Sequence, residues 1–255
     1  MQIFVVSLKR AKERRNRLIG HFKERQLEYD LVDAVDGLQL TQSELDAYCD
    51  MEVVRKHPNW LTKGMIGACL SHYNIYKKII EQNLPYACII EDDVEVDENF
   101  KSLLAILEKD ILERKFIMAH YTSWQNIELK KVKDLNASYG LYDMQVLEGV
   151  NSAACYIISN EVCKKLINLI LPIKQGPDSW TEFAKKGTIN HIYAIYPKPV
   201  NIIYAKSTID YIPKGSLKSI ISNVINDYKI FPFFQLLKYR RKLLNNKINR
   251  IKVIS

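Results

Sequence analysis

Short apolar runs alternate with longer amphipathic stretches over most of the chain. The run from Ile3 to Leu8 predicts a buried strand, and the stretch from Lys9 to Gln26 has the spacing of a charged helix with one apolar face. Further strands are predicted at 29–32, 86–90, 116–119, 144–147, 153–158, 191–196 and 200–204, and further helices at 41–48, 73–82, 98–109 and 160–171. Residues 120–140 are polar, have no clear period and receive no assignment. Strands that alternate with helices predict an α/β domain with a mostly parallel central sheet flanked by helices.

Carboxylates crowd the end of the strand predicted at 86–90. Glu91, Asp92 and Asp93 follow the apolar run directly, and Glu95 and Asp97 come close behind. Negative charges this close repel one another unless a cation neutralises them. Mg²⁺ or Mn²⁺ is the expected partner, because one or two carboxylates usually hold such an ion while substrate phosphates complete its shell. The alternative is an acidic turn before a helix, where the helix dipole favours Asp and Glu.

Basic residues follow the first predicted strand. Ser7 and Arg10 lie nearest its end, and Arg14 and Arg15 come early in the helix, where anions are favoured. Arg17 is expected to lie on a solvated helix face. The chain has neither a Walker phosphate loop nor a GxGxxG motif, which removes the main support for the common ATPase and dinucleotide-binding classes.

Three loops follow predicted strand ends, after Leu8, Val32 and Ile90. Ligands bind beyond the carboxyl ends of strands in an open α/β sheet, so these loops are expected to lie together. The sequence therefore predicts that the first two loops meet a nucleotide and the third its metal-bound phosphates.

The positive charge of the chain is concentrated at its end. The net charge is +8 over 255 residues. Residues 216–255 hold nine basic residues and one acid, so everything before them is neutral. Basic residues mixed with aromatic ones predict an amphipathic helical segment that binds an anionic membrane surface. A helical hairpin packed on the domain is the alternative.

The cysteines and the N-terminus indicate the cellular compartment of the protein. The five cysteines are odd in number, lie in or next to apolar segments and have no CxxC spacing, which favours buried free thiols in a reducing compartment. No signal peptide is recognisable at the N-terminus, and no apolar run approaches membrane-spanning length. The expected location is the cytoplasm, at a membrane face.

Several short blocks occur in the order of a known family. The blocks are Val6-Ser7-Leu8 with Arg10 and Arg14-Arg15, Ala34-Val35-Asp36-Gly37, Leu61-Thr62-Lys63-Gly64 through Leu70-Ser71-His72, Ile90-Glu91-Asp92-Asp93, and Ala154-Cys155-Tyr156-Ile157-Ile158 with Pro177-Asp178. Over residues 1–209 the chain resembles glycosyltransferase family 25, in particular its bacterial lipopolysaccharide and lipooligosaccharide enzymes. Met65 departs from the pattern, because the family usually has Glu after the Gly.

The resemblance implies a GT-A-like fold, which is assigned to a domain at 1–215. The basic helical segment at 216–255 lies outside what the resemblance explains. The resemblance also implies inverting transfer of a hexose, usually galactose from UDP-galactose, onto a lipid-linked oligosaccharide acceptor. Asp93 would reach Mn²⁺ or Mg²⁺, while Glu91 or Asp92 would meet the ribose or a second metal position. The implied donor site consists of Ser7, Leu8, Arg10, Arg14, Asp36, Ser71, His72, Glu91 and Asp92.

An inverting transferase needs a base that takes the proton of the acceptor hydroxyl. Asp178 is the leading candidate because it falls on a family block, although Asp is also a good helix N-cap. Glu148 is the second candidate, with a solvated strand end as its alternative. Trp180 is expected to stack on a sugar.

Two histidines have both a functional and a structural interpretation. His72 falls on the Leu-Ser-His block, so a role in the donor site competes with a structural hydrogen bond. His191 opens a predicted strand and is a candidate to complete the metal shell.

Two other classes of protein remain open at this stage. The basic, aromatic end of the chain is compatible with nucleic-acid binding, although the neutral body and the acidic cluster oppose it, so no nucleic acid is expected as a partner. A membrane-associated structural protein without transferase activity is the other class.

Overall fold

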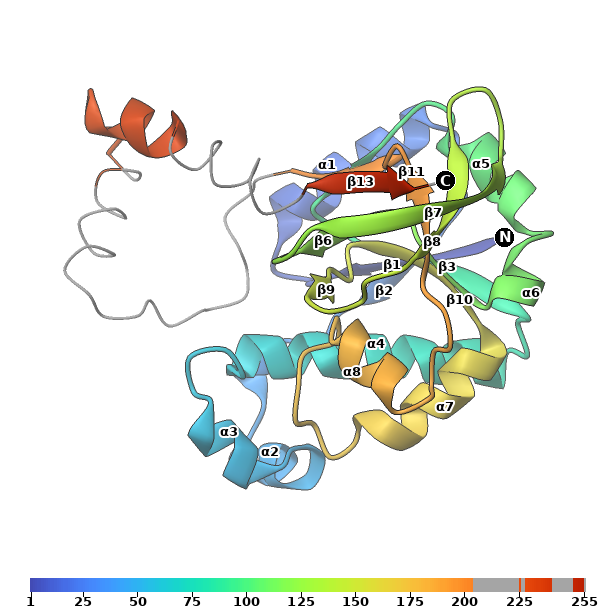
Figure 1. Ribbon diagram of the computed structural model, residues 1–255. Helices are drawn as coiled ribbons and strands as arrows, with labels where there is room; N and C mark the ends of the chain where they lie inside the picture. The colour runs from blue at the N-terminus through green and yellow to red at the C-terminus, as the bar shows by residue number, and fades with distance from the viewer. Residues whose placement is uncertain (204–224, 226–227, 240–249, 255) are drawn as a thin grey trace.

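The computed structural model describes residues 1–203, 225, 228–239 and 250–254 (Figure 1). The strands are β1 Gln2–Ser7, β2 Asp30–Asp33, β3 Tyr86–Glu91, β4 Val94–Val96, β5 Phe116–Met118, β6 Thr122–Ser123, β7 Ile127–Asp134, β8 Gly140–Met144, β9 Val150–Asn151, β10 Cys155–Ser159, β11 Tyr193–Tyr196, β12 Val200–Ile202 and β13 Ile251–Ile254. The helices are α1 Lys12–Glu24, the 3₁₀ helix η1 Gly37–Gln39, α2 Gln42–Tyr48, α3 Met51–Lys56, α4 Lys63–Glu81, α5 Phe100–Leu107, α6 Ile111–Arg114, α7 Asn160–Ile170 and α8 Trp180–Lys185.

A nine-stranded sheet forms the centre, in the order β13-β7-β8-β11-β5-β10-β3-β1-β2. The pairings make seven strands run in one direction and only β8 and β10 in the other. The predicted α/β class with a mostly parallel sheet is therefore confirmed. The carboxyl ends of β1, β2, β3, β5 and β11 share one edge, where β10 begins.

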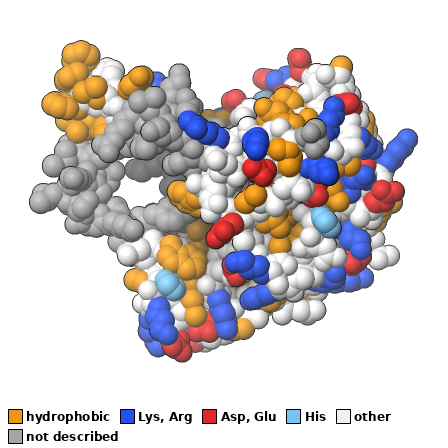
Figure 2. All heavy atoms as spheres, in the orientation of Figure 1, with side chains coloured by type: hydrophobic (Ala, Val, Ile, Leu, Met, Phe, Trp, Pro, Cys, Tyr) orange, Lys and Arg blue, Asp and Glu red, His pale blue; other side chains and the backbone are white. Residues whose placement is uncertain are grey.

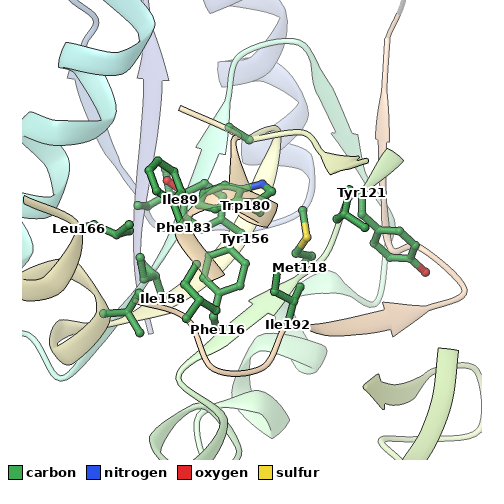
Figure 3. Close-up of a cluster of buried hydrophobic side chains, with 14 of the residues drawn as sticks. Ile89, Phe116, Met118, Tyr121, Tyr156, Ile158, Leu166, Trp180, Phe183 and Ile192 are labelled. Carbon is green, nitrogen blue, oxygen red and sulfur yellow. The ribbon is translucent and has the colours of Figure 1, made fainter. Parts of the chain in front are cut away.

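Alternate residues of the strands point to opposite faces of the sheet, as the period of two requires. On one face Phe4 and Tyr156 pack against α4, α7 and α8, and Figure 3 shows Tyr156, Phe116 and Trp180 close together in this core. On the other face Ile3 and Val5 pack against α1, α5 and α6. Figure 1 shows the two helical layers on opposite sides of the sheet.

Several predicted elements differ from the structure. Helix α4 begins at Lys63, ten residues before the predicted start, with the Thr62 side chain accepting a hydrogen bond from the Met65 amide. Glycine residues lower the helix propensity of the first turns of α4, so the sequence pattern did not predict these turns as helix. Gly67 is nevertheless needed there, because α4 packs closely against the loop after β2. Helix α3 was not predicted, and residues 120–140 contain β6 and all of β7, whose charged residues face solvent. The capping box of Thr41 and Glu44 is confirmed at α2.

The basic segment is described in part. Residues 233–239 are helical, as predicted, but β13 is a strand that pairs in parallel with β7, so the prediction of a helical segment to the end is wrong there. A strand forms because Ile251 to Ile254 can complete the hydrogen bonds of the β7 edge. The predicted boundary at 215 lies outside the described residues. No helix in the described part of the chain is long and apolar enough to span a bilayer.

The loop after β2 and the start of α4 approach closely at two glycines. A Cβ on Gly37 would lie 1.7 Å from the Lys63 carbonyl oxygen, and one on Gly67 would lie 2.6 Å from the Gly37 amide nitrogen. Both obstacles are backbone atoms, so a side chain at either position must push the loop away from the helix.

Gly37→Ala is expected to lower the free energy of unfolding by about 2 kcal/mol or more, because the added methyl group has no space. Gly20→Ala is the control, since nothing lies within 4 Å of a Cβ there and alanine favours the helix. Urea denaturation of the two variants measures the difference. Equal unfolding midpoints would contradict the close contact.

Candidate active site

The carboxyl ends of β1, β2 and β3 and the start of α4 surround an open cleft. The residues that line it include all nine predicted donor-site residues and Asp93: Ser7, Leu8, Arg10, Arg14, Asp36, Ser71, His72, Glu91, Asp92 and Asp93. The structure thus brings together residues from four separate parts of the sequence. Their common location follows from the parallel arrangement of the three strands.

Asp92 is held by hydrogen bonds and a cation. Its Oδ2 accepts a 2.6 Å hydrogen bond from Ser7 Oγ, and its Oδ1 pairs with Arg14. Arg17 Nη2 donates to the Asp92 carbonyl oxygen at 2.8 Å, so the expectation that Arg17 only faces solvent is wrong. Burial raises the pKa of Asp92, and the hydrogen bond from Ser7 opposes that rise. These contacts fix Asp92 within the protein.

Asp93 has one paired and one unpaired oxygen. Its Oδ2 lies 3.0 Å from Arg14 Nη2, while its buried Oδ1 has no hydrogen-bond partner. Burial, and then the charge of Glu91, raises the pKa of Asp93 to about 6. A buried carboxylate oxygen without a partner is a fitting ligand for a hard divalent cation.

Within the described residues, no group of three or more His, Cys, Asp or Glu side chains is arranged to hold a metal ion. A cation beside Asp93 would therefore need oxygen ligands from a bound molecule or from water. Substrate phosphates commonly supply such ligands to Mg²⁺.

Glu91 is held from the core side of the cleft. Its Oε1 lies 3.3 Å from Nε2 of His72, whose other ring nitrogen lies 2.7 Å from the Tyr156 hydroxyl. Tyr76 continues this chain of hydrogen bonds with a 2.7 Å contact to Tyr156. His72 is thus a buried group that bridges the core and the cleft.

Hydrogen bonds hold the loop that follows β2, which forms one side of the cleft. Arg10 Nε donates to Asp36 Oδ2 at 2.7 Å, and Asp36 caps the 3₁₀ helix η1. Ser71 Oγ donates to the Gly67 carbonyl oxygen at 2.6 Å and accepts a hydrogen bond from the Val35 amide at 2.8 Å. Ser71 therefore fixes the loop that forms this wall.

Asp178 is not among the residues that line the cleft. Its Oδ2 accepts a 3.1 Å hydrogen bond from the Ser152 amide, in the segment before β10. Burial raises its pKa, Glu91 is close enough to raise it further, and His72 is close enough to lower it. Trp180 is fully buried in the core, so the expectation that it stacks on a sugar is wrong.

Glu148 and His191 are not brought to the cleft. Glu148 is exposed and lines a separate hollow beside α8. His191 precedes β11, which runs parallel to β5, so it lies at the opposite edge of the sheet, 3.7 Å from an oxygen of Asp143. The geometry therefore does not support His191 as a ligand of a metal at Asp93.

Two polar groups at the same sheet edge were missed by the sequence interpretation. His120 follows β5, with its Nδ1 2.8 Å from the Val200 carbonyl oxygen and its buried Nε2 unpartnered. Burial lowers its pKa to about 4. Burial also lowers the pKa of Lys198, after β11, to about 8. The strand-end rule, applied to 116–119 and 191–196, would have singled out both residues.

Several known proteins are similar to this chain in sequence. Residues 1–181 match the family model described as "Glycosyltransferase family 25 (LPS biosynthesis protein)". Procollagen galactosyltransferase 2 of Mus musculus is 37% identical over 115 residues, 43% of this chain and 18% of that protein. Procollagen galactosyltransferase 1-A of Xenopus laevis is 32% identical over 189 residues, 69% of this chain and 29% of that protein.

Another relative carries a different name. "Inactive glycosyltransferase 25 family member 3" of Homo sapiens is 33% identical over 132 residues, 50% of this chain and 21% of that protein. The chain thus aligns with less than a third of the length of each of these relatives.

Among solved structures, A197 from STIV aligns with a TM-score of 0.39 and 10% identity over 76% of this chain and 80% of that one. The family model covers well over half of the chain and includes the whole cleft. The chain belongs to glycosyltransferase family 25.

Proposed function

We propose that this chain is an inverting, metal-dependent transferase that moves galactose from UDP-galactose to a sugar of a lipopolysaccharide or lipooligosaccharide acceptor. The observation that carries the proposal is the unpaired Asp93 oxygen beside Arg14, in a cleft at the strand ends. A hard cation suits the carboxylate, and an arginine suits a diphosphate. The family description and the names of the relatives support glycosyl transfer and galactose.

Asp93 would hold the cation, and Arg10 and Arg14 line the same cleft, where they would meet a diphosphate. Bound Mn²⁺ or Mg²⁺ would offset the negative charge that develops on the departing UDP. Arg14 contacts both Asp92 and Asp93, so its guanidinium lies beside the carboxylate that would hold the cation.

In the proposed reaction the acceptor hydroxyl oxygen forms a bond to C1 of the hexose on the face opposite UDP. The bond between C1 and the diphosphate oxygen breaks, and its electron pair leaves with UDP. The hydroxyl proton passes to Asp178, whose raised pKa makes it a stronger base than an exposed aspartate.

A screen of UDP-hexoses with Mn²⁺ or Mg²⁺ tests this proposal. UDP-galactose is expected to release UDP, and to do so faster when a lipooligosaccharide acceptor is added. GDP-hexoses serve as the control for the nucleotide. If no UDP-hexose is bound or turned over with either metal, the proposal fails.

Acidification is expected to weaken Mn²⁺ binding, because Asp93 must be ionised to act as a ligand and its pKa is raised to about 6. Going from about pH 7.5 to about pH 5 protonates most of Asp93 and should lower the affinity about tenfold. The free Mn²⁺ signal in electron paramagnetic resonance, recorded without nucleotide, avoids the titration of UDP itself. An affinity that stays constant over this range would argue against Asp93 as the ligand.

We also propose that residues 228–239 bind an anionic membrane surface that presents the acceptor. Their exposed apolar side chains are Tyr228, Ile230, Phe231, Phe233, Leu236 and Tyr239. Figure 2 shows hydrophobic side chains gathered over this segment, at the upper left. Lys229 and Lys238 add positive charge to the same segment.

Phe231→Ser with Phe233→Ser is expected to weaken binding to phosphatidylglycerol vesicles about tenfold or more, because two aromatic side chains no longer enter the interface. Co-sedimentation measures this loss, and Trp124→Ser is the control, because Trp124 is 75% exposed on the domain itself. An equal loss of vesicle binding in the double variant and in Trp124→Ser would mean that residues 228–239 have no particular role in membrane binding.

A further inference from the structure

A chain of three hydrogen bonds runs from the core to the floor of the cleft. It joins the hydroxyls of Tyr76 and Tyr156 at 2.7 Å, Tyr156 and His72 Nδ1 at 2.7 Å, and His72 Nε2 and Glu91 Oε1 at 3.3 Å. Tyr76, Tyr156 and His72 are each at most 1% exposed, whereas the Glu91 side chain is 31% exposed. His72 and Glu91 both line the cleft, but of the four side chains only that of Glu91 is substantially exposed to a ligand.

The direction of these hydrogen bonds follows from the chemistry of the groups. Burial raises the pKa of both tyrosines far above the usual range, so each keeps its hydroxyl proton. Tyr76 then donates to Tyr156, Tyr156 donates to His72 Nδ1, and His72 carries its proton on Nε2 and donates it to Glu91. Every donor has an acceptor in this arrangement.

The reverse direction leaves groups unsatisfied. If His72 carried its proton on Nδ1, its Nε2 lone pair would face an oxygen of Glu91. The hydroxyl proton of Tyr76 would then have no acceptor, since among the described residues this hydroxyl contacts only that of Tyr156. Unsatisfied buried polar groups are costly, so the first direction is favoured.

We infer that His72 is a positioning residue for Glu91, and that Tyr156, oriented by Tyr76, fixes the His72 ring with its proton on Nε2. Glu91 Oε1 is then occupied by His72. Its Oε2, which has no hydrogen-bond partner among the described residues, is held toward the cleft to accept a hydrogen bond from a hydroxyl of the nucleotide-sugar donor. This role of Glu91 rests on the proposed function, whereas the orientation of His72 does not.

The neighbouring carboxylates Glu91, Asp92 and Asp93 differ in their partners. Asp92 is tied to Ser7 and Arg14, and Asp93 keeps an unpaired oxygen for a cation. Glu91 has no arginine or lysine partner in the described structure and receives its hydrogen bond from His72. The three adjacent acids therefore have three different environments.

The first test is the ¹⁵N NMR spectrum of the His72 ring in the full chain without ligand. The expected spectrum has a protonated Nε2 and an unprotonated Nδ1, and Tyr156→Phe should change it because Nδ1 loses its donor. A proton on Nδ1, or on both nitrogens at neutral pH, would overturn the inference whatever the enzyme does.

The second test measures UDP affinity with Mn²⁺ by calorimetry. Tyr156→Phe keeps the ring that packs on Phe116 and Trp180 but should weaken binding about tenfold, because Glu91 is no longer held in place. Tyr121→Phe is the matched control. It removes a hydroxyl that is equally buried and donates to the Ile195 carbonyl oxygen, and it should leave affinity unchanged.

His72→Gln and His72→Leu complete the second test. The amide of glutamine can donate to Glu91 in place of Nε2, so His72→Gln should recover part of the affinity that His72→Leu loses. Equal affinities for these two variants, or for the two tyrosine variants, would overturn the positioning role. Absence of UDP binding by the unaltered chain would instead contradict the proposed function and leave the NMR result standing.

Discussion

Asp93→Asn is expected to abolish metal-dependent binding of UDP, a loss of about a hundredfold or more in affinity. Asparagine keeps the shape of the side chain but removes the negative charge that a divalent cation requires. The pKa of Asp93 is raised to about 6, which means that its ionised form destabilises the folded protein near neutral pH. The uncharged asparagine removes this cost, so the variant should unfold at the same or a higher temperature. Calorimetry of UDP with and without Mn²⁺ measures the loss, and thermal unfolding shows that the variant is folded.

Glu95→Gln is the matched control for this result. Glu95 belongs to the same acidic run, but it is exposed on β4, where it lies opposite Asn201 in the ladder with β12. Its loss removes the same charge from the same segment without touching the cleft. An equal effect of the two variants would mean that Mn²⁺ responds to the overall negative charge, and Asp93 would lose its assigned role.

Asp178→Asn is expected to lower the transfer rate at least about a thousandfold while UDP binding changes little. General base catalysis contributes about 10²–10⁴ to a rate. Asparagine can still accept the hydrogen bond from the Ser152 amide, so the segment before β10 should keep its position. The measurements are the turnover of UDP-galactose with acceptor and the affinity for UDP with Mn²⁺.

Glu148→Gln provides the comparison for Asp178, because the sequence offered both residues as the base. Glu148 lines another hollow, so its replacement should leave turnover within about twofold. An active Asp178→Asn variant would remove Asp178 as the base. The unpartnered Nε2 of His120, at the same sheet edge, would then be the next group to test.

The sequence was sufficient to predict those residues of the cleft that lie at the end of a strand. Ser7 ends β1 and Glu91 ends β3, and each can be recognised from the end of an apolar run. Once the strands are parallel, such residues must meet at one edge of the sheet. This is why the residues at the ends of β1, β2 and β3 line one cleft, whereas Ser71 and His72 lie on α4 and were expected there only from the family resemblance.

Other parts of the site depend on information that local patterns do not contain. The error for His191 arose because residues at the start of a strand lie at the opposite edge from those at its end. The contact of Arg17 with the Asp92 carbonyl oxygen depends on how α1 packs against the turn after β3. The hydroxyl of Tyr156 meets His72 only after β10 and α4 have packed together, and its strand pattern resembles that of any buried aromatic residue.

The pairing of β13 with β7 gives the proposed membrane segment two points of attachment. The chain leaves the two-stranded sheet of β4 and β12 and joins the edge of the nine-stranded sheet at β13, so residues 228–239 lie between two points anchored on the domain. Cutting the chain before this segment would remove a strand and expose the edge of β7, which invites aggregation. An internal excision that keeps residues 250–254 is therefore the informative truncation. A segment anchored at both ends also restricts how the body can turn on a bilayer, so the mouth of the cleft would face the membrane at a limited range of angles.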